Sequence, residues 1–237
     1  MKNEFLLVLS LILCFGTVVL LVKILKKQGL FMWTVFATIT ANIEVLIVVN
    51  AFGMEQTLGN VMFASSFLVT DIISECYGKK EANKAVFVGC LTSVFFIIFS
   101  QLWLCFTPAP SDWAMPSIRS IFSNTPQVMV AGLAAYCISQ FFDVWLYHKW
   151  WNITEKKTGN KKGFLWLRNN GSTLVSQFIN TVIFSFGAFW NLHEFKTLIA
   201  ITISSYVIYI FTSLADTPFL YLARKIIEKD SGKSDLN

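Results

Sequence analysis

The chain has 237 residues, of which 55% are hydrophobic and only 14% are charged, and its formal net charge is +5. An average soluble domain carries about 25% charged residues, so this composition excludes a soluble enzyme, a nucleic-acid reader and a secreted disulfide scaffold. Seven apolar stretches of about 20 residues each leave no room for a separate soluble domain. The sequence therefore predicts an integral membrane protein.

The seven apolar stretches follow one another along the chain, and each is too long to be a strand. Backbone groups in hydrocarbon must bond to one another, so we expect every stretch to be a helix. The predicted helices cover residues 5–22, 31–49, 61–76, 85–106, 128–147, 174–190 and 198–222. The predicted fold class is an all-α integral membrane protein, a bundle of six core transmembrane helices plus an extra N-terminal helix.

The first stretch lies where a signal peptide would lie, but no small-residue cleavage site follows it. We therefore expect this helix to be retained. The predicted organisation is an N-terminal helix with a basic linker over residues 1–30, a six-helix core over residues 31–225, and a polar tail over residues 226–237.

Lysine and arginine residues gather in alternate connections between the predicted helices. Sixteen of the 19 lie in segments on one side of the predicted bundle, and three lie on the other. Positive charge near span ends stays on the cytoplasmic side, which predicts an N-terminus outside and a cytoplasmic C-terminus. The net positive charge thus reflects topology in a lipid bilayer, and we expect no nucleic-acid partner.

The five cysteines lie inside or near the ends of the apolar stretches and show no Cys-x-x-Cys spacing. We expect them to be structural thiols, neither disulfide-bonded nor metal ligands. The sequence shows no metal site and no phosphate-binding loop, so we expect no cofactor and no ATPase activity of the chain itself.

Acidic residues within the predicted spans are the main candidates for function, and they are Glu44, Asp71, Glu75, Asp143 and Asp216. The predicted spans contain no Lys or Arg to pair with them. An unpaired charge at the bilayer centre costs about 2.5 to 3.5 kcal/mol, so these groups should line a cavity, be protonated or reach a cytoplasmic lysine. For Glu75, an ion pair with Lys79 and a place in a site are equally favoured.

Polar side chains also share helix faces at spacings of three or four residues. The pairs are Asp71 with Glu75, Gln140 with Asp143, and Gln177 with Asn180. Residues 139–143 and 176–180 are nearly the same five residues on consecutive helices. This pattern favours a two-sided polar site between the midplane and the cytoplasmic side, and hydrogen bonding between helices without a ligand is the alternative.

Carboxylates and amides without an internal cation do not suit a phosphate or carboxylate ligand. They suit a flat ligand with several N–H donors. A guanine-like base presents an amide N–H and an exocyclic amine side by side, and its ring can stack on an aromatic side chain.

Five motifs occur in a specific order along the chain. They are Ala41-Asn42-Ile43, Asp71-Ile72-Ile73-Ser74-Glu75-Cys76-Tyr77-Gly78, Gln140-Phe141-Phe142-Asp143, Trp166-Leu167-Arg168-Asn169 with Ser172-Thr173 and Gln177, and Asp216-Thr217-Pro218 with Tyr221. Together they resemble the queuosine precursor transporter family of the vitamin uptake transporter superfamily, over about residues 31–225. The resemblance implies a six-helix core and import of a 7-deazaguanine, which is the 7-cyano or 7-aminomethyl precursor or queuine itself.

The polar pattern and the resemblance together predict a set of substrate-binding residues. The set is Asn42, Asp71, Glu75, Gln140, Asp143, Arg168, Asn169, Ser172, Gln177, Asn180 and Asp216. The acidic members would accept N–H groups or carry protons, the amides would orient the base edge, and Arg168 with Asn169 would lie at the cytoplasmic mouth.

The predicted function is import of queuosine precursors through the bacterial inner membrane, without an enzymatic step. The alternative is a substrate-binding component for another vitamin or purine-like compound that requires a separate ATPase complex. An intramembrane aspartyl protease is disfavoured because the chain lacks the Gly-x-Gly-Asp pattern. The sequence leaves open whether the chain forms a homodimer, whether it has an ATPase partner and what energy source drives transport.

Overall fold

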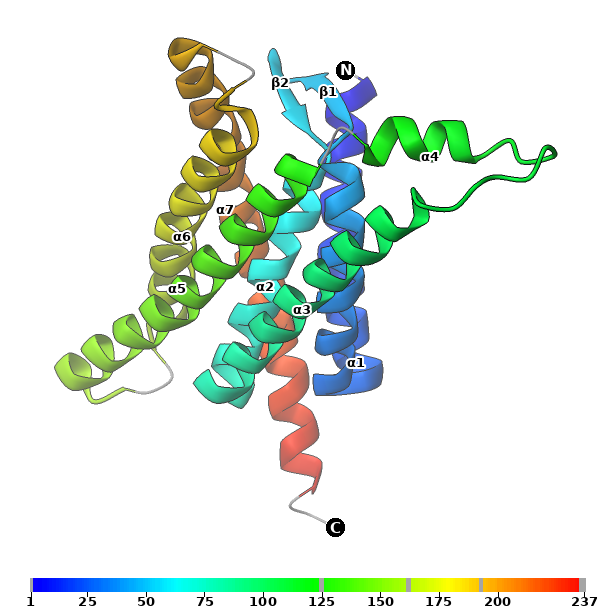
Figure 1. The fold of residues 1–237 in the computed structure, drawn as a ribbon. Helices are drawn as coiled ribbons and strands as arrows, with labels where there is room; N and C mark the ends of the chain where they lie inside the picture. Colours follow the sequence, from blue (N-terminus) through cyan, green and yellow to red (C-terminus); the bar gives the residue numbers. More distant parts are fainter. Residues whose placement is uncertain (1, 124–125, 161–162, 192–193, 235–237) are drawn as a thin grey trace.

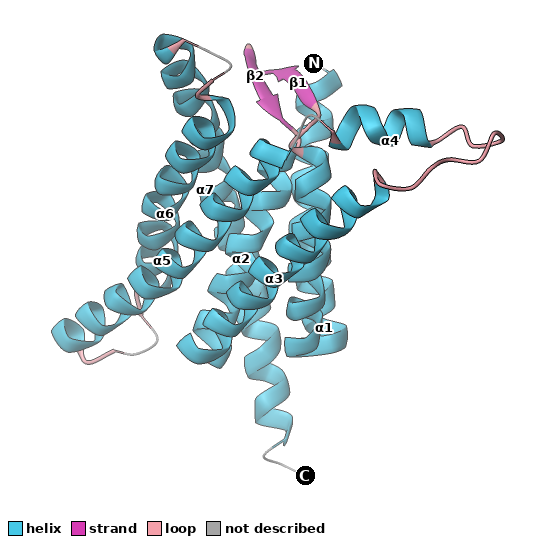
Figure 2. Ribbon diagram, in the orientation of Figure 1, coloured by secondary structure: helices cyan, strands magenta, loops and turns pink. Residues whose placement is uncertain are grey.

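The computed structural model describes residues 2–123, 126–160, 163–191 and 194–234, and helices dominate it (Figure 2). The helices are α1 (Lys2–Glu44), α2 (Gly59–Tyr77), α3 (Lys79–Trp103), α4 (Met115–Phe122), α5 (Pro126–Thr158), α6 (Leu165–Phe189) and α7 (Phe195–Ser234). A small antiparallel hairpin of β1 (Val48–Ala51) and β2 (Met54–Thr57) connects α1 to α2, with Val48 opposite Thr57.

Helix α1 is two antiparallel helices joined at Lys26, whose backbone angles (φ 53°, ψ −131°) are not helical. The chain reverses so tightly there that a Cβ on Gly29 would lie 2.6 Å from the Leu21 carbonyl oxygen, which explains the glycine. At the far end, the Asn3 side chain donates a hydrogen bond to the Asn50 carbonyl oxygen at 2.9 Å. The two halves of α1 correspond to the first two predicted helices.

Each of the seven predicted ranges falls largely on a helix, so the expected all-α membrane architecture is confirmed. The ends differ from the prediction. Helix α5 continues to Thr158, beyond the predicted end at 147, and α6 begins at Leu165 instead of residue 174. Helical backbone hydrogen bonds form equally well in polar segments, so hydropathy alone places such ends poorly. Residues 226–234 of the predicted polar tail are also helical, as the end of α7.

Helix α2 lies at the centre of the bundle (Figure 1) and packs against α1, α3, α5 and α7. Fifteen of its 19 residues are buried. Helices α1, α3, α5, α6 and α7 are long and apolar enough to cross a membrane, whereas α2 is not in that group. Its polar side chains lower its mean hydropathy. Such side chains are tolerated there because other helices surround α2 in place of lipid.

The outer helices show the opposite distribution, with large apolar side chains pointing away from the protein. Phe87, Phe95 and Phe211 are 55%, 55% and 69% exposed. Polar residues inside and apolar residues outside are what a lipid environment requires of a helical bundle.

The two ends of the bundle hold different connections (Figure 1). One end, here named the basic end, holds the turn at Lys26, the α2–α3 junction, the α5–α6 connection and the C-terminus. The other, here named the hairpin end, holds the N-terminus, the β1–β2 hairpin, α4 and the α6–α7 connection. The segments that contain sixteen of the 19 basic residues thus meet at one end.

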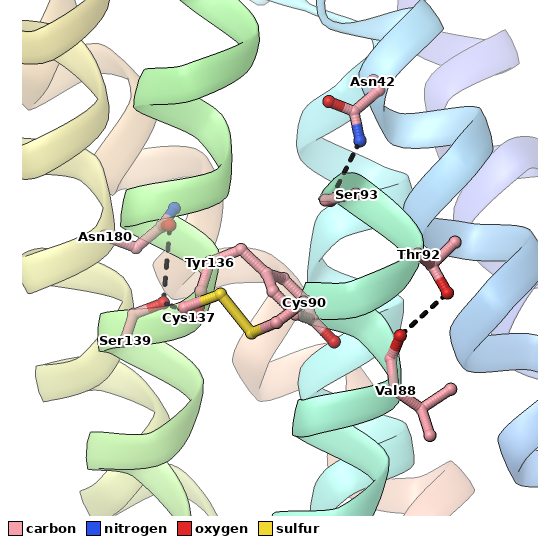
Figure 3. The surroundings of a disulfide bond; sticks show 9 residues. All are labelled: Asn42, Val88, Cys90, Thr92, Ser93, Tyr136, Cys137, Ser139 and Asn180. Carbon is pink, nitrogen blue, oxygen red and sulfur yellow. Dashed lines mark hydrogen bonds between the residues drawn. A yellow bond between two sulfur atoms is a disulfide. The ribbon is translucent and has the colours of Figure 1, made fainter. Parts of the chain in front are cut away.

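The expectation that all five cysteines are thiols is wrong for one pair. Cys90 of α3 and Cys137 of α5 form a disulfide, with Cα atoms 5.9 Å apart (Figure 3). Cys14, Cys76 and Cys105 are free. The sequence gives no spacing signal for the bridge, because it depends on where two helices cross.

Candidate functional site

A cavity of about 50 Å³ lies between α1, α2, α3, α5, α6 and α7. Its lining includes Thr57 and Gly59 beside the β-hairpin and Val128 near the start of α5, so it lies in the half nearest the hairpin end. Its polar lining residues are Thr38, Asn42, Asn60, Ser66, Ser93 and Asn180. Its aromatic lining residues are Phe63, Tyr136, Phe184 and Tyr209.

Two of the predicted site residues line this cavity from opposite sides (Figure 3). Asn42 donates through Nδ2 to the Thr38 carbonyl oxygen at 2.8 Å and to Ser93 Oγ at 3.3 Å. Across the cavity, Asn180 Oδ1 accepts a hydrogen bond from Ser139 Oγ at 3.5 Å. The cavity therefore has an amide on each side.

The Tyr136 ring forms part of the wall between these amides. It packs edge-on to Phe63 with ring centroids 5.6 Å apart, and it occupies the space where Gly89 of α3 has no side chain. The Cys90–Cys137 disulfide joins the same two helices, α3 and α5, and each cysteine is the next residue after Gly89 or Tyr136 (Figure 3).

Gln140, another predicted site residue, uses both ends of its amide to connect α5 to α2. Its Nε2 donates to Ser66 Oγ at 2.8 Å, and its Oε1 accepts from Thr70 Oγ1 at 2.9 Å. Ser66 also lines the cavity. Gln140 thus makes hydrogen bonds between helices, which is what the alternative to a ligand site predicted for these polar residues. It lies at the boundary between the cavity and the polar residues beyond it.

A cluster of three buried aspartates lies beyond Gln140, toward the basic end. Asp71 of α2, Asp143 of α5 and Asp216 of α7 are at most 1% exposed and close enough to interact electrostatically. Helix α6 supplies donors to two of them. Thr173 Oγ1 donates to Asp71 Oδ2, and Asn169 Nδ2 donates to Asp216 Oδ1, both at 2.9 Å.

Several acceptors in this cluster have no hydrogen-bond partner among the described residues. They are Asp71 Oδ1, both carboxyl oxygens of Asp143, and Asn169 Oδ1. Asp143 lies near Ser172 and Ser176 of α6, yet neither of its oxygens makes a hydrogen bond of regular geometry. The amide of Gln177 is likewise buried and unpartnered at both its oxygen and its nitrogen. Buried polar groups without partners are rare in folded proteins, and water, an ion or a ligand can supply the missing partner.

An ion-pair node centred on Glu75 lies still nearer the basic end. Arg168 of α6 donates to both Glu75 oxygens, at 2.6 Å and 2.9 Å, and Arg224 of α7 lies 3.1 Å from one of them. Tyr147 of α5 donates its hydroxyl to the same carboxylate at 2.7 Å, and the Arg168 guanidinium lies 4.3 Å from the centre of the Trp151 ring. One carboxylate of α2 therefore holds α5, α6 and α7 together.

The node corrects the expectation that no basic side chain is available inside the bundle. Arg168 is fully buried because α6 begins nine residues earlier than predicted. Its partner Glu75 is 3% exposed, and no ion pair joins Glu75 to Lys79 in the described part of the chain. Glu75 therefore does form an ion pair, as one of its two interpretations predicted, but its partners are Arg168 and Arg224 and not Lys79.

Nine of the eleven predicted residues thus fall in three groups. Asn42 and Asn180 line the cavity, and Glu75 with Arg168 forms the ion-pair node. Asp71, Asp143, Asn169, Ser172 and Asp216 lie in the aspartate cluster. Gln140 lies between cavity and cluster, and Gln177 is buried on α6 between Thr173 and Asn180.

Sequence reasoning missed most of the cavity lining. Asn60, Tyr136, Phe184 and Tyr209 come from four different helices, and each resembles an ordinary helix residue on its own. Thr173, the donor to Asp71, belongs to the motif that begins at Trp166, but it is not among the predicted substrate-binding residues. Ser66 with Thr70 offered the i,i+4 spacing that could have indicated the polar face of α2.

Comparisons with known proteins identify the family of this chain. A family profile described as "Putative vitamin uptake transporter" matches residues 57–223. The "Probable queuosine precursor transporter" of Bacillus subtilis (strain 168) is 39% identical over 223 residues, which are 94% of this chain and 95% of that relative. No solved structure gives a significant match.

The alignment with the relative leaves 14 of the 237 residues uncovered, fewer than the first half of α1 contains. The similarity therefore extends into the N-terminal helix and is not confined to the six-helix core. The matched family is one of transporters and not of enzymes. The chain belongs to the queuosine precursor transporter family of vitamin uptake transporters.

Proposed function

We propose that this protein imports queuosine precursors across the bacterial inner membrane. The single observation that supports this most strongly is the 39% identity, over nearly the whole chain, to a relative with that name. The positive-inside rule assigns the basic end to the cytoplasm, with the N-terminus outside and the C-terminus inside. The cavity then lies in the outer half of the bundle, where an importer must admit its substrate.

The proposed substrates are 7-deazaguanines, namely the 7-cyano and 7-aminomethyl precursors and queuine. Aromatic walls such as Phe63 and Tyr136 favour a flat base, because its ring face stacks on aromatic side chains. The amides of Asn42 and Asn180 offer a donor and an acceptor to the base edge. In this arrangement the cavity receives the base before the deeper polar residues do.

The aspartate cluster is the proposed second position of the base on its way inward. Its unpartnered acceptors suit the adjacent N–H groups of a guanine-like edge. The Glu75 node closes the bundle between this cluster and the cytoplasm. In this proposal, release to the cytoplasm requires Arg168 and Arg224 to separate from Glu75.

The direct test uses a bacterial host that lacks both precursor synthesis and its own queuosine precursor transporter. The chain is expressed in this host, each 7-deazaguanine is supplied in turn, and queuosine-modified tRNA is detected by boronate gel shift. Rescue by the chain alone supports the proposal and ranks the three substrates. Failure of a well-expressed, membrane-inserted protein contradicts it, and co-purification of ATPase subunits would favour the alternative of an ATPase-dependent module.

The proposed substrate residues are tested in the same assay. Replacing Asp71 or Asp143 by alanine removes a buried acceptor, which should weaken substrate binding by about 1 to 3 kcal/mol. Glu55→Ala, at an exposed position of the β-hairpin, is the matched control and should rescue like the wild type. If both aspartate variants express normally and also rescue like the wild type, this assignment is wrong.

A further inference from the structure

The three aspartates of the cluster have no counter-ion in the described part of the protein. No ion pair there includes Asp71, Asp143 or Asp216, and the two nearest guanidinium groups, Arg168 and Arg224, both contact Glu75. Three negative charges buried close together repel one another and lose their hydration. The cluster is therefore stable only if some of the carboxyl groups hold protons.

Hydrogen-bond accounting leads to the same conclusion without reference to charge. Carboxylate and amide oxygens are acceptors only. Asp71 Oδ1, both oxygens of Asp143, and Asn169 Oδ1 accept no hydrogen bond of regular geometry from the described residues, although Ser172 and Ser176 lie near Asp143. Asn169 is fully buried, and its Nδ2 bond to Asp216 holds its side chain in the cluster. A proton on a carboxyl group turns an acceptor into a donor, so two protons supply hydrogens that neighbouring oxygens can accept.

The charged and titratable groups described around the cluster supply neither a counter-ion nor a hydrogen-bond donor to these unpartnered oxygens. The titratable or charged residues nearby are Glu75 on α2, Tyr147 on α5, Arg168 on α6 and Arg224 on α7. All four belong to the ion-pair node. Tyr147 donates its hydroxyl to Glu75, and both arginines contact the same carboxylate, so the node directs its cations and its phenol proton away from the aspartates.

The cluster also lies between the cavity and the ion-pair node. Gln140 separates it from the cavity by bonding to Ser66 and Thr70, and the Glu75 node separates it from the basic end. Protons can therefore exchange with water only when the bundle opens toward one end. A carrier that exposes such a group alternately to the two sides of a membrane moves protons across it.

We propose that Asp71, Asp143 and Asp216 form a proton-binding site and that this protein imports its substrate together with protons. This inference rests on the proposed function and adds the driving force. Asp143 is the first residue to vary, because neither of its oxygens makes a hydrogen bond of regular geometry with the described residues.

The test uses the full-length protein in proteoliposomes and radiolabelled 7-cyano-7-deazaguanine. Counterflow against unlabelled substrate inside, at equal pH, first measures transport without a driving force. Accumulation is then measured with an interior that is more alkaline than the exterior. A gradient of about one pH unit should raise accumulation by up to about tenfold for each proton carried, and a protonophore should abolish the increase.

Two further measurements test the site. Asp143→Asn cannot gain or lose a proton, so the ratio of accumulation with and without the gradient should fall to about one. Glu55→Gln, the same chemical change at an exposed position, should keep the wild-type ratio. A pH dye trapped inside wild-type vesicles should report acidification when substrate is added outside, and this readout does not depend on the folding of any variant.

The outcomes separate the inference from the proposed function. Counterflow without any response to the gradient, or without acidification, overturns proton coupling and leaves the proposed function intact. A gradient response that survives in Asp143→Asn overturns the site, and stimulation by the reverse gradient overturns co-transport. Absence of counterflow with the cyano compound, the aminomethyl compound and queuine contradicts the proposed function itself.

Discussion

Glu75 contacts three other helices through one carboxylate, and its burial makes those contacts strong. Arg168 is fully buried, and it has one carboxylate partner in the described part of the chain. Removing one member of a buried ion pair leaves the other charge without compensation, which is far more costly than losing an exposed pair.

Replacing Glu75 by glutamine is therefore expected to destabilise the protein by about 3 to 5 kcal/mol. The measurement is thermal unfolding of the purified protein in detergent. Glu55→Gln, on the exposed β-hairpin, is the control and should unfold at the wild-type temperature. Equal unfolding temperatures for the two variants would show that the node does not hold the helices together.

Gly89 sets the position of Tyr136 in the cavity wall. A Cβ at residue 89 would overlap the Tyr136 hydroxyl oxygen and ring, so Gly89→Ala should push the ring out of place. We expect a loss of about 1 to 3 kcal/mol in stability and a raised KM for uptake. Gly16→Ala is the matched helical control, because nothing lies within 4 Å of its added Cβ. An unchanged KM for Gly89→Ala would remove Tyr136 from the proposed site.

At the scale of the helices, α3 and α5 are connected by a covalent bond as well as by packing. The Cys90–Cys137 disulfide closes a loop with a sequence separation of 47 residues, beside the cavity. A cross-link of this kind restricts the unfolded chain and thereby stabilises the folded one.

Replacing Cys137 by serine should lower stability by about 2 to 4 kcal/mol. Cys105→Ser, which changes an exposed free thiol, should have no such effect. Counting thiols with maleimide after denaturation without reductant checks the bond directly, and the wild type should label at three of its five cysteines. Labelling at all five would show that the helices are not cross-linked.

At the scale of the whole molecule, the asymmetry of positive charge predicts which way the bundle sits in the membrane. The connections that contain most of the lysines and arginines meet at one end (Figure 1). Because such charges stay in the cytoplasm, all of these connections favour the same orientation.

A reporter at the C-terminus should therefore be cytoplasmic. A green fluorescent protein fused there is expected to fluoresce, and an alkaline phosphatase fused there is expected to be inactive. In a chain that also carries Cys105→Ser, a cysteine introduced at Trp113, which is 86% exposed between α3 and α4, should react with a membrane-impermeant maleimide from outside whole cells. Labelling at Trp113 only after the cells are broken would reverse the proposed orientation.

Several features followed from local sequence because they depend only on composition and spacing. The seven helices follow from apolar runs in a chain that must satisfy its own backbone in hydrocarbon. Asp71, Asp143 and Asp216 could be recognised as buried because acidic residues within apolar helices avoid lipid. The motif that contains Arg168 could also be recognised in the sequence, but its ion pair with Glu75 could not be predicted from it.

The membrane class, the seven apolar helices, the charge asymmetry and the buried acidic residues all follow from the amino-acid sequence. The division of the predicted site residues among a cavity, an aspartate cluster and an ion-pair node is visible only in the folded structure. The same is true of the Cys90–Cys137 bridge and the contact of Tyr136 with Gly89. Hydropathy and spacing act within one helix, whereas these contacts depend on how helices distant in sequence cross, and no local pattern encodes that geometry.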